Sequence, residues 1–153
     1  MRILVFANTN GNADLVYEVF KQQKPDAVFH LGNGIKDLRL LRFDVPLYVT
    51  KGCFDHFVCA PKITKIMAEK TLILCTYGNK FKTNRDLKML TQKAKKEHAN
   101  IVLFGYGQKT YTKRDGIIFV NPGQILKNSV SCILLDINEN NIEIEDINFV
   151  KMT

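Results

Sequence analysis

The sequence of 153 residues is poor in the side chains that build metal sites and disulfide frameworks. It has three histidines, and its four cysteines form no C-x-x-C pair and no other spacing typical of a metal site. The histidines therefore leave little from which to build a metal centre. We expect free thiols, most of them small buried apolar residues, at Cys53, Cys59, Cys75 and Cys132.

Long apolar runs are also missing. No stretch approaches the roughly 20 residues that a helix needs to cross a bilayer. The apolar run after Met1 ends at Asn8 and does not resemble a signal peptide. The sequence shows no linker, internal repeat or low-complexity segment. It therefore predicts one domain over residues 1–153, in a cytoplasmic protein that does not contact a membrane.

Acidic residues are outnumbered by basic ones. The chain has 15 Asp and Glu against 22 Lys and Arg, for a net charge of +7. This balance permits binding to phosphate-rich partners, nucleic acid included. A solvated lysine-rich surface is the favoured interpretation, because the lysines are not interleaved with aromatic residues as they are in a nucleic-acid platform. The lysines of the middle third are Lys62, Lys65, Lys70, Lys80, Lys82, Lys88, Lys93, Lys95 and Lys96.

Short apolar segments alternate with segments of helical periodicity, and this order is typical of an α/β fold. A first helix is indicated by apolar residues at helical spacing, namely Leu15, Val16, Val19 and Phe20. Further helices are predicted over residues 37–42 and 84–97, the second capped by Thr83 or Asn84. The predicted strands, with a largely parallel first sheet and an antiparallel remainder, are residues 2–6, 27–31, 45–50, 71–75, 101–104, 110–113, 117–120, 130–136 and 142–150.

A short polar or glycine-containing break follows each of the first five predicted strands. Loops at the carboxyl ends of parallel strands meet on one side of an open α/β sheet. We therefore expect these breaks to line one common cleft. They are Asn8-Thr9-Asn10, Gly32-Asn33, Gly52-Cys53, Tyr77-Gly78-Asn79 and Gly105-Tyr106-Gly107-Gln108.

The breaks belong to six short motifs that agree with one known family in order, spacing and flanking strands. The segments are Asn8-Thr9-Asn10-Gly11-Asn12, His30-Leu31-Gly32-Asn33, Gly52-Cys53-Phe54-Asp55, Tyr77-Gly78-Asn79, Gly105-Tyr106-Gly107-Gln108 and Asn121-Pro122-Gly123-Gln124. The family has Asp-x-His-Gly-Asn, His-x-Gly-Asp, Gly-Asn-x-Asp, His-Gly-His, Gly-His-x-His and Asn-Pro-Gly-Ser. The chain thus resembles the small, single-domain, phosphodiesterase-like group of calcineurin-like metallophosphoesterases, whose fold a retromer scaffold subunit shares. The resemblance implies a two-sheet β-sandwich flanked by helices, in four layers αββα.

The resemblance also implies a cleft with two divalent metals, which hold and polarise a phosphate and activate a water. In the family, the ligands of the first metal correspond to Asn8, Asn10, Asn33 and Gln108. Those of the second metal correspond to Asn33, which would bridge, and to Cys53, Tyr77 and Tyr106. All seven positions are substituted in this chain.

The substitutions remove the charge that a metal pair requires. A neutral Asn carbonyl is a poor replacement for a carboxylate, and Asn in place of His loses the nitrogen that borderline metals prefer. Without an anionic bridge, two dications close together repel each other with little compensation. Tyr at two former His positions adds bulk. We therefore predict that the binuclear centre does not form, and we assign no catalytic residue, metal ligand or cofactor.

Three functions follow from this resemblance. The first is a catalytically inactive homologue, a pseudoenzyme that acts as a binding or scaffold module. The second is a weak phosphodiesterase or phosphoesterase whose Asn, Gln and Tyr oxygens hold Mn²⁺ or Mg²⁺. The third is metal-free binding of a nucleotide or nucleic acid in the degenerate cleft, which salt should weaken steeply. The candidate ligand-binding residues are Asn8, Asn10, Asn33, Cys53, Tyr77, Tyr106 and Gln108.

Each candidate residue also has a structural interpretation. The three Asn residues either bind phosphate or ribose or satisfy the loop backbone, and the second is favoured. Tyr77 and Tyr106 either stack on a ligand ring or pack against each other. Cys53 lacks the basic neighbour that a nucleophilic thiolate needs. We expect His30 to be structural and Asp55 to order its loop.

An apolar cluster follows the third motif. It consists of Phe54, Phe57, Val58 and Pro61. The cluster is either an exposed surface for a partner protein or a homodimer, or part of the buried core. A protein and a phosphate-containing ligand therefore both stand as candidate partners.

Overall fold

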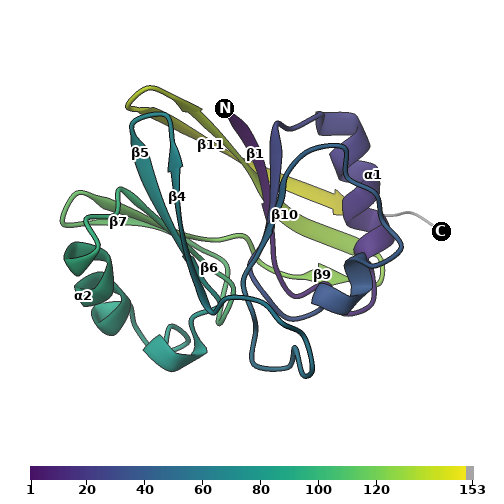
Figure 1. Cartoon of the computed structure of the whole chain (residues 1–153), viewed down its shortest axis with the longest axis horizontal. Helices are drawn as coiled ribbons and strands as arrows, with labels where there is room; N and C mark the ends of the chain where they lie inside the picture. The colour runs from purple at the N-terminus through teal and green to yellow at the C-terminus, as the bar shows by residue number, and fades with distance from the viewer. Residues whose placement is uncertain (151–153) are drawn as a thin grey trace.

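The structure, a computed structural model, describes residues 1–150. Its strands form two sheets that stack face to face, with one helix on the outer side of each sheet (Figure 1). This is the four-layer αββα sandwich that the family resemblance implies. No helix in the described part of the chain is long and apolar enough to cross a membrane.

Six strands form the first sheet: β1 (Arg2–Phe6), β2 (Ala27–His30), β3 (Leu47–Val49), β9 (Ile125–Leu126), β10 (Ser129–Asn138) and β11 (Asn141–Val150). Their order is β11-β10-β1-β2-β3, with β9 paired to β10. The strands β1, β2 and β3 are parallel, whereas β10 runs antiparallel to both β1 and β11. The carboxyl ends of β1, β2 and β3 therefore lie on the same side of this sheet.

Five strands form the second sheet: β4 (Ile63–Ala68), β5 (Thr71–Thr76), β6 (Ile101–Phe104), β7 (Thr110–Arg114) and β8 (Ile117–Asn121). Their order is β4-β5-β6-β8-β7. The central strands β5, β6 and β8 are parallel, and the edge strands β4 and β7 are antiparallel to their neighbours.

Two α-helices cover the outer faces of the sheets. The first, α1 (Ala13–Gln23), packs its apolar side on the first sheet, and the second, α2 (Lys88–Lys96), packs Leu90 and Ala94 on the second sheet. Two short 3₁₀ turns, η1 (Ile35–Leu38) and η2 (Asn79–Phe81), lie in the loops after β2 and β5.

Side chains of each central strand alternate between the two faces of its sheet, as the pleat requires. In β1, Ile3 and Val5 pack between the sheets, whereas Leu4 and Phe6 pack against the α1 side. The continuous apolar runs of the central strands therefore fill two cores at once, which explains why they show no polar alternation. The same division in β6 separates Ile101 and Leu103 from Val102 and Phe104.

The division of strands between the sheets differs from the sequence prediction. The segments 71–75 and 101–104 belong to the second sheet and not to one largely parallel sheet with β1. The strand β4 was not predicted, because its half-exposed pattern at a sheet edge, with Lys65 at its centre, lacks an apolar run. Both sheets have parallel centres, so the strand ends that form the cleft come from two sheets.

The helix boundaries also differ from the prediction. The helix expected over 84–97 begins at Lys88, and neither Thr83 nor Asn84 caps it. The Thr83 hydroxyl donates instead to the Tyr106 carbonyl at 2.8 Å. The helix expected over 37–42 is the 3₁₀ turn η1, which begins after Gly34 at φ +106°.

All four cysteines are free, as expected. Two of them, Cys75 and Cys132, are buried, and burial raises the pKa of both thiols, that of Cys132 to about 12. Cys53 is half-buried and Cys59 is exposed, so the expectation of mostly buried thiols is right for two of the four.

We predict that Leu103→Ala lowers the free energy of unfolding by about 2–5 kcal/mol, because the variant leaves a cavity between the sheets. Leu103 is fully buried on β6. The matched control is Leu40→Ala, at a side chain that is 94% exposed, for which we expect a change within about 0.5 kcal/mol. Urea denaturation at unchanged m-value measures both. A Leu103→Ala variant as stable as the control would contradict the packing described above.

Candidate ligand-binding cleft

A cleft of about 490 Å³ lies where the loops after the parallel strands of both sheets meet. Five of the seven candidate residues line it, namely Asn8, Asn10, Asn33, Tyr77 and Tyr106. The two Asn residues near the N-terminus follow β1, and the tyrosines follow β5 and β6. The remaining lining residues are Gly34, Asp37, Phe54, Gly105, Gly107 and Gln124.

A chain of hydrogen bonds links the side chains of this cleft. The Asn33 Nδ2–H donates to the Tyr77 hydroxyl at 2.8 Å. That hydroxyl donates to Asn8 Oδ1 at 2.9 Å, and Asn8 Nδ2–H donates to the Gly105 carbonyl at 2.7 Å. At the other end of the chain, Asn33 Oδ1 accepts from the backbone N–H of Phe54 at 2.8 Å. The Tyr77 hydroxyl therefore lies between the two amides, and both amide oxygens already accept a hydrogen bond.

The three Asn residues share an uncommon backbone conformation. Their φ angles are 51° at Asn8, 49° at Asn10 and 49° at Asn33. Asn adopts this left-handed region more readily than most residues. The side chain of Asn10 donates to the carbonyls of Asn8 and Ile125, at 2.9 Å each. These contacts agree with the interpretation that the Asn side chains satisfy the loop backbone.

The Asp55 carboxylate ties together the loops after β2 and β3. It accepts hydrogen bonds from the backbone N–H groups of Asn33 at 3.0 Å, Gly34 at 2.8 Å, Ile35 at 3.1 Å and Gly52 at 2.8 Å. The loops approach so closely that a Cβ at Gly52 would lie 2.2 Å from Asn33 Oδ1. Asp55 thus orders its loop, as the sequence analysis expects.

Asp37 is a cleft residue that the sequence analysis did not identify as one. Its Oδ2 accepts from the Thr9 hydroxyl at 2.6 Å and from the Gly11 N–H at 2.8 Å. No Lys or Arg is among the described residues that line the cleft, so its fixed side-chain charge is negative. The sequence carried no signal for this position, because Asp37 fell inside a predicted helix.

The two tyrosines pack against each other at one wall. Their ring centroids are 5.6 Å apart, and their planes are inclined by 51°. Burial of Tyr77 raises the pKa of its hydroxyl, so that the group stays protonated and donates to Asn8 near neutral pH.

Two candidate residues lie outside the cleft. Cys53 lines a separate pocket that also contacts Tyr77, and its Sγ accepts from Asn33 Nδ2–H at 3.7 Å. Gln108 is exposed and lines a hollow of about 430 Å³ between β9, β10 and β11. Four of the five breaks therefore line the cleft, and the Gly52-Cys53 break contacts it through Asn33.

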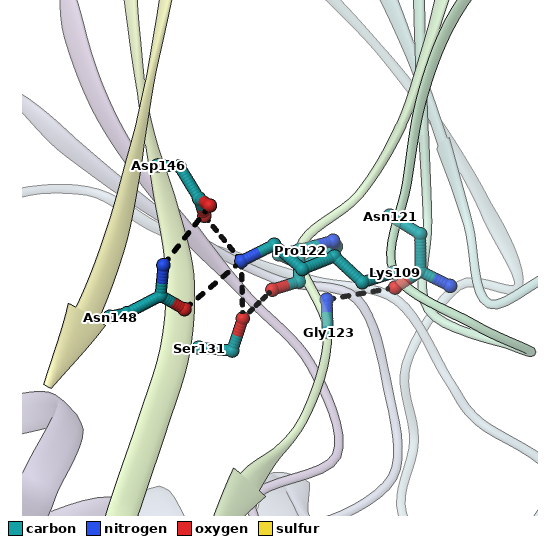
Figure 2. Close-up of polar contacts among 7 residues, drawn as sticks. All are labelled: Lys109, Asn121, Pro122, Gly123, Ser131, Asp146 and Asn148. Carbon is teal, nitrogen blue, oxygen red and sulfur yellow. Dashed lines mark hydrogen bonds and ion pairs between the residues drawn. The ribbon is translucent and has the colours of Figure 1, made fainter. Parts of the chain in front are cut away.

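The hollow beside Gln108 is also lined by Lys109, which forms an ion pair with Asp146. Figure 2 shows the Lys109 ammonium directed at Asp146, Asn148 and Ser131. It donates to the Ser131 hydroxyl at 2.7 Å and to the Asn148 side-chain oxygen at 3.2 Å, and it pairs with the Asp146 carboxylate. The charge of Lys109 is therefore neutralised by Asp146 within the protein.

The histidines take no part in the cleft. His30 is fully buried, where its Nδ1 accepts from the Gly32 N–H at 3.1 Å and its ring meets Phe6 edge-on. Burial lowers the pKa of His30 to about 4, so the ring is neutral near pH 7. This is the structural role that the sequence analysis expects. His56 and His98 are exposed and do not line the cleft.

The apolar cluster after the third motif lies at the surface. Phe54 is 75% exposed and Phe57 is 99% exposed, so the alternative that this cluster forms buried core is wrong. Phe54 also lines the cleft, and the Lys36 ammonium lies 5.9 Å from the Phe57 ring centroid.

The side chains of the cleft do not fit a pair of divalent metals. Apart from Asp37, whose Oδ2 already accepts from Thr9 and Gly11, the cleft offers neutral amides and phenols, whereas such metals favour carboxylate or imidazole. The oxygens of Asn8 and Asn33 already accept hydrogen bonds from Tyr77 and Phe54. The buried Asp55 carboxylate already accepts four backbone N–H groups.

Comparison with characterised families agrees with the architecture. Residues 1–140 match the model of the calcineurin-like phosphoesterase superfamily domain. A protein of Mycoplasma pneumoniae named a probable metallophosphoesterase is 26% identical over 129 residues, which cover 81% of this chain and 79% of that protein.

Solved structures show the same fold. A conserved protein of Streptococcus pneumoniae, described as a predicted phosphoesterase, is 26% identical with a TM-score of 0.76, over 95% of this chain and 88% of that one. A mutant of Vps29 from Entamoeba histolytica is 19% identical with a TM-score of 0.77, over 97% of this chain and 99% of that one. The family match spans most of the sequence, and the chain therefore belongs to the calcineurin-like phosphoesterase superfamily.

Proposed function

We propose that this member of the superfamily holds no metal pair, does not hydrolyse phosphoesters and acts as a binding or scaffold module. The observation that carries the proposal is the Tyr77 hydroxyl, which hydrogen-bonds both Asn8 and Asn33. These two residues correspond to a terminal ligand and the bridging ligand of the metal pair in the family. In this chain a phenol joins the same two positions.

The charge of the cleft supports the same proposal. A metal would have to replace hydrogen bonds that the amides already make, and it would gain neutral ligands in return. Phosphoester hydrolysis also needs a group that offsets the phosphate charge and lowers the pKa of a water. The described side chains of the cleft include no Lys, Arg or His, and Asp37 would repel a phosphate.

A binding role is supported by the exposed aromatic side chains beside the cleft. Phe54 and Phe57 lie on the loop that Asp55 holds, so a well-ordered loop presents them to solvent. Large exposed apolar side chains grouped in this way are typical of interaction surfaces.

The alternative is residual hydrolysis with Mn²⁺ or Mg²⁺. It is favoured by the likeness to the Mycoplasma protein that is named a probable metallophosphoesterase. A measurement of metal binding distinguishes the metal-free binding module from this alternative, because only hydrolysis requires a bound metal.

We predict that the purified protein, stripped with EDTA and dialysed, shows no saturable Mn²⁺ binding by calorimetry and no metal-dependent cleavage of an activated phosphodiester. The control is a variant that restores the family's ligands: Asn8→Asp, Asn10→His, Asn33→Asp, Cys53→Asn, Tyr77→His, Tyr106→His and Gln108→His. This variant should bind Mn²⁺, because it regains carboxylates and imidazoles in the family's order. Micromolar Mn²⁺ binding with turnover by the unmodified protein would refute the proposal.

We predict that Tyr77→Phe lowers the free energy of unfolding by about 1–3 kcal/mol, because it leaves polar groups of the half-buried Asn8 and Asn33 without their partner. The matched control is Tyr106→Phe, since the Tyr106 hydroxyl makes no hydrogen bond to the described residues. Its effect should stay within about 0.5 kcal/mol. Equal effects in urea denaturation would mean that the phenol does not join the two amides.

A further inference from the structure

A second pocket of about 370 Å³ lies beside the cleft, on the other side of Tyr77. It is built at the end of the β4–β5 hairpin where Ile63 pairs with Thr76, and from the loop after β3. Three lysines line it, Lys51, Lys62 and Lys80, and we call it the lysine pocket. No acidic residue among the described residues lines it.

The three lysines are not paired with a described acidic residue. Within residues 1–150, none of them forms an ion pair or a side-chain hydrogen bond with a carboxylate. The lysines that do pair with acidic residues are Lys65, Lys93, Lys95 and Lys109. The lysine pocket therefore carries positive charge that no acidic side chain of the described residues neutralises. Because the three lysines line one concave surface, a single anion could contact more than one of them.

Two of these ammonium groups lie close to each other. The proximity and charge of Lys80 lower the pKa of Lys62. Like charges held near each other disfavour the charged form, and an anion placed between them removes that penalty. An anion bound between the two ammonium groups would therefore favour the charged form of both.

The rest of the pocket is largely apolar. The side chains of Ile63, Tyr77 and Phe81 contribute to its wall, and Phe81 is itself packed against the core under α2. A site with fixed positive charge and an apolar or aromatic wall is complementary to a ligand that has both an anionic and a flat apolar part. Its volume is within the range of about 300–1,000 Å³ that is common for small-molecule sites.

We propose that the lysine pocket binds an organic phosphate of the nucleoside diphosphate class, with the phosphates on Lys51, Lys62 and Lys80 and the base against Tyr77 and Phe81. The proposal deepens the binding role given above. It rests on that function, because a metal pair in the adjacent cleft would itself attract the phosphates.

The test is calorimetric titration of the protein in EDTA with ADP, inorganic pyrophosphate and adenosine. We expect saturable binding of ADP, weaker binding of pyrophosphate and no measurable binding of adenosine. The triple variant Lys51→Ala, Lys62→Ala and Lys80→Ala should bind ADP at least about tenfold more weakly, the loss expected from removing one charge-assisted hydrogen bond or more. Arg at the same three positions should retain binding.

The control variant carries Lys70→Ala, Lys113→Ala and Lys127→Ala, which remove the same charge at exposed positions outside the pocket. ADP binding should be preserved in it. Equal weakening in both triple variants would overturn the proposal, because it would mean attraction by net charge alone. Adenosine binding as tight as ADP binding would also overturn it.

Further results distinguish failure of the lysine-pocket proposal from failure of the metal-free function proposed above. Failure to bind ADP or pyrophosphate in EDTA, in a protein that also binds no Mn²⁺, refutes the lysine pocket alone. Binding of ADP that appears only when Mn²⁺ is added refutes both. A single-stranded oligonucleotide that binds far more tightly than ADP, and does so equally in both triple variants, overturns the small-ligand assignment in favour of a nucleic-acid backbone.

Discussion

The functional face of this fold depends on the buried carboxylate of Asp55. Parallel strands bring their end loops to the same side of a sheet but do not connect them, so the loops after β2 and β3 need a separate tie. Asp55 connects these loops, because its carboxylate accepts hydrogen bonds from four of their backbone N–H groups. Hydrogen bonds to a charged acceptor are stronger than neutral ones. They fix the backbone of Asn33, and its side chain then reaches both Phe54 and Tyr77.

From Asn33, the hydrogen bonds continue from one sheet to the other. Asn8 and Asn33 follow strands of the first sheet, whereas Tyr77 and Gly105 follow strands of the second. The path Asn33 to Tyr77 to Asn8 to Gly105 thus crosses between the sheets three times. In the family, residues at three of these positions are metal ligands, and the metals link the same loops. In this chain the buried Tyr77 phenol links the same loops through hydrogen bonds to two neutral amides.

The family's motifs predicted the sandwich, and short continuous apolar runs predicted most of its strands. They did not predict β4, an edge strand that lacks an apolar run and has the exposed Lys65 at its centre. They also did not predict that β5 belongs to the second sheet. Pairing between distant strands leaves little trace in a single sequence. The same limit applies to the site. Motif positions identified Asn8, Asn33 and Tyr77, but only the fold shows that Cys53 and Gln108 line neighbouring pockets and that Asp37 lines the cleft.

The distribution of charge around Tyr77 connects the two pockets. On one side lies a cleft whose described lining has Asp37 and no cation; on the other lies a pocket with three lysines and no acid. A metal pair gives a phosphoesterase cleft its attraction for phosphate. Without a metal pair, as proposed for this chain, a phosphate placed in the cleft would meet the carboxylate of Asp37. Positive charge that is not paired with an acid lies in the lysine pocket, which Tyr77 also lines. If this chain binds phosphates, electrostatics therefore favour a site displaced from the one that the fold's catalytic members would use.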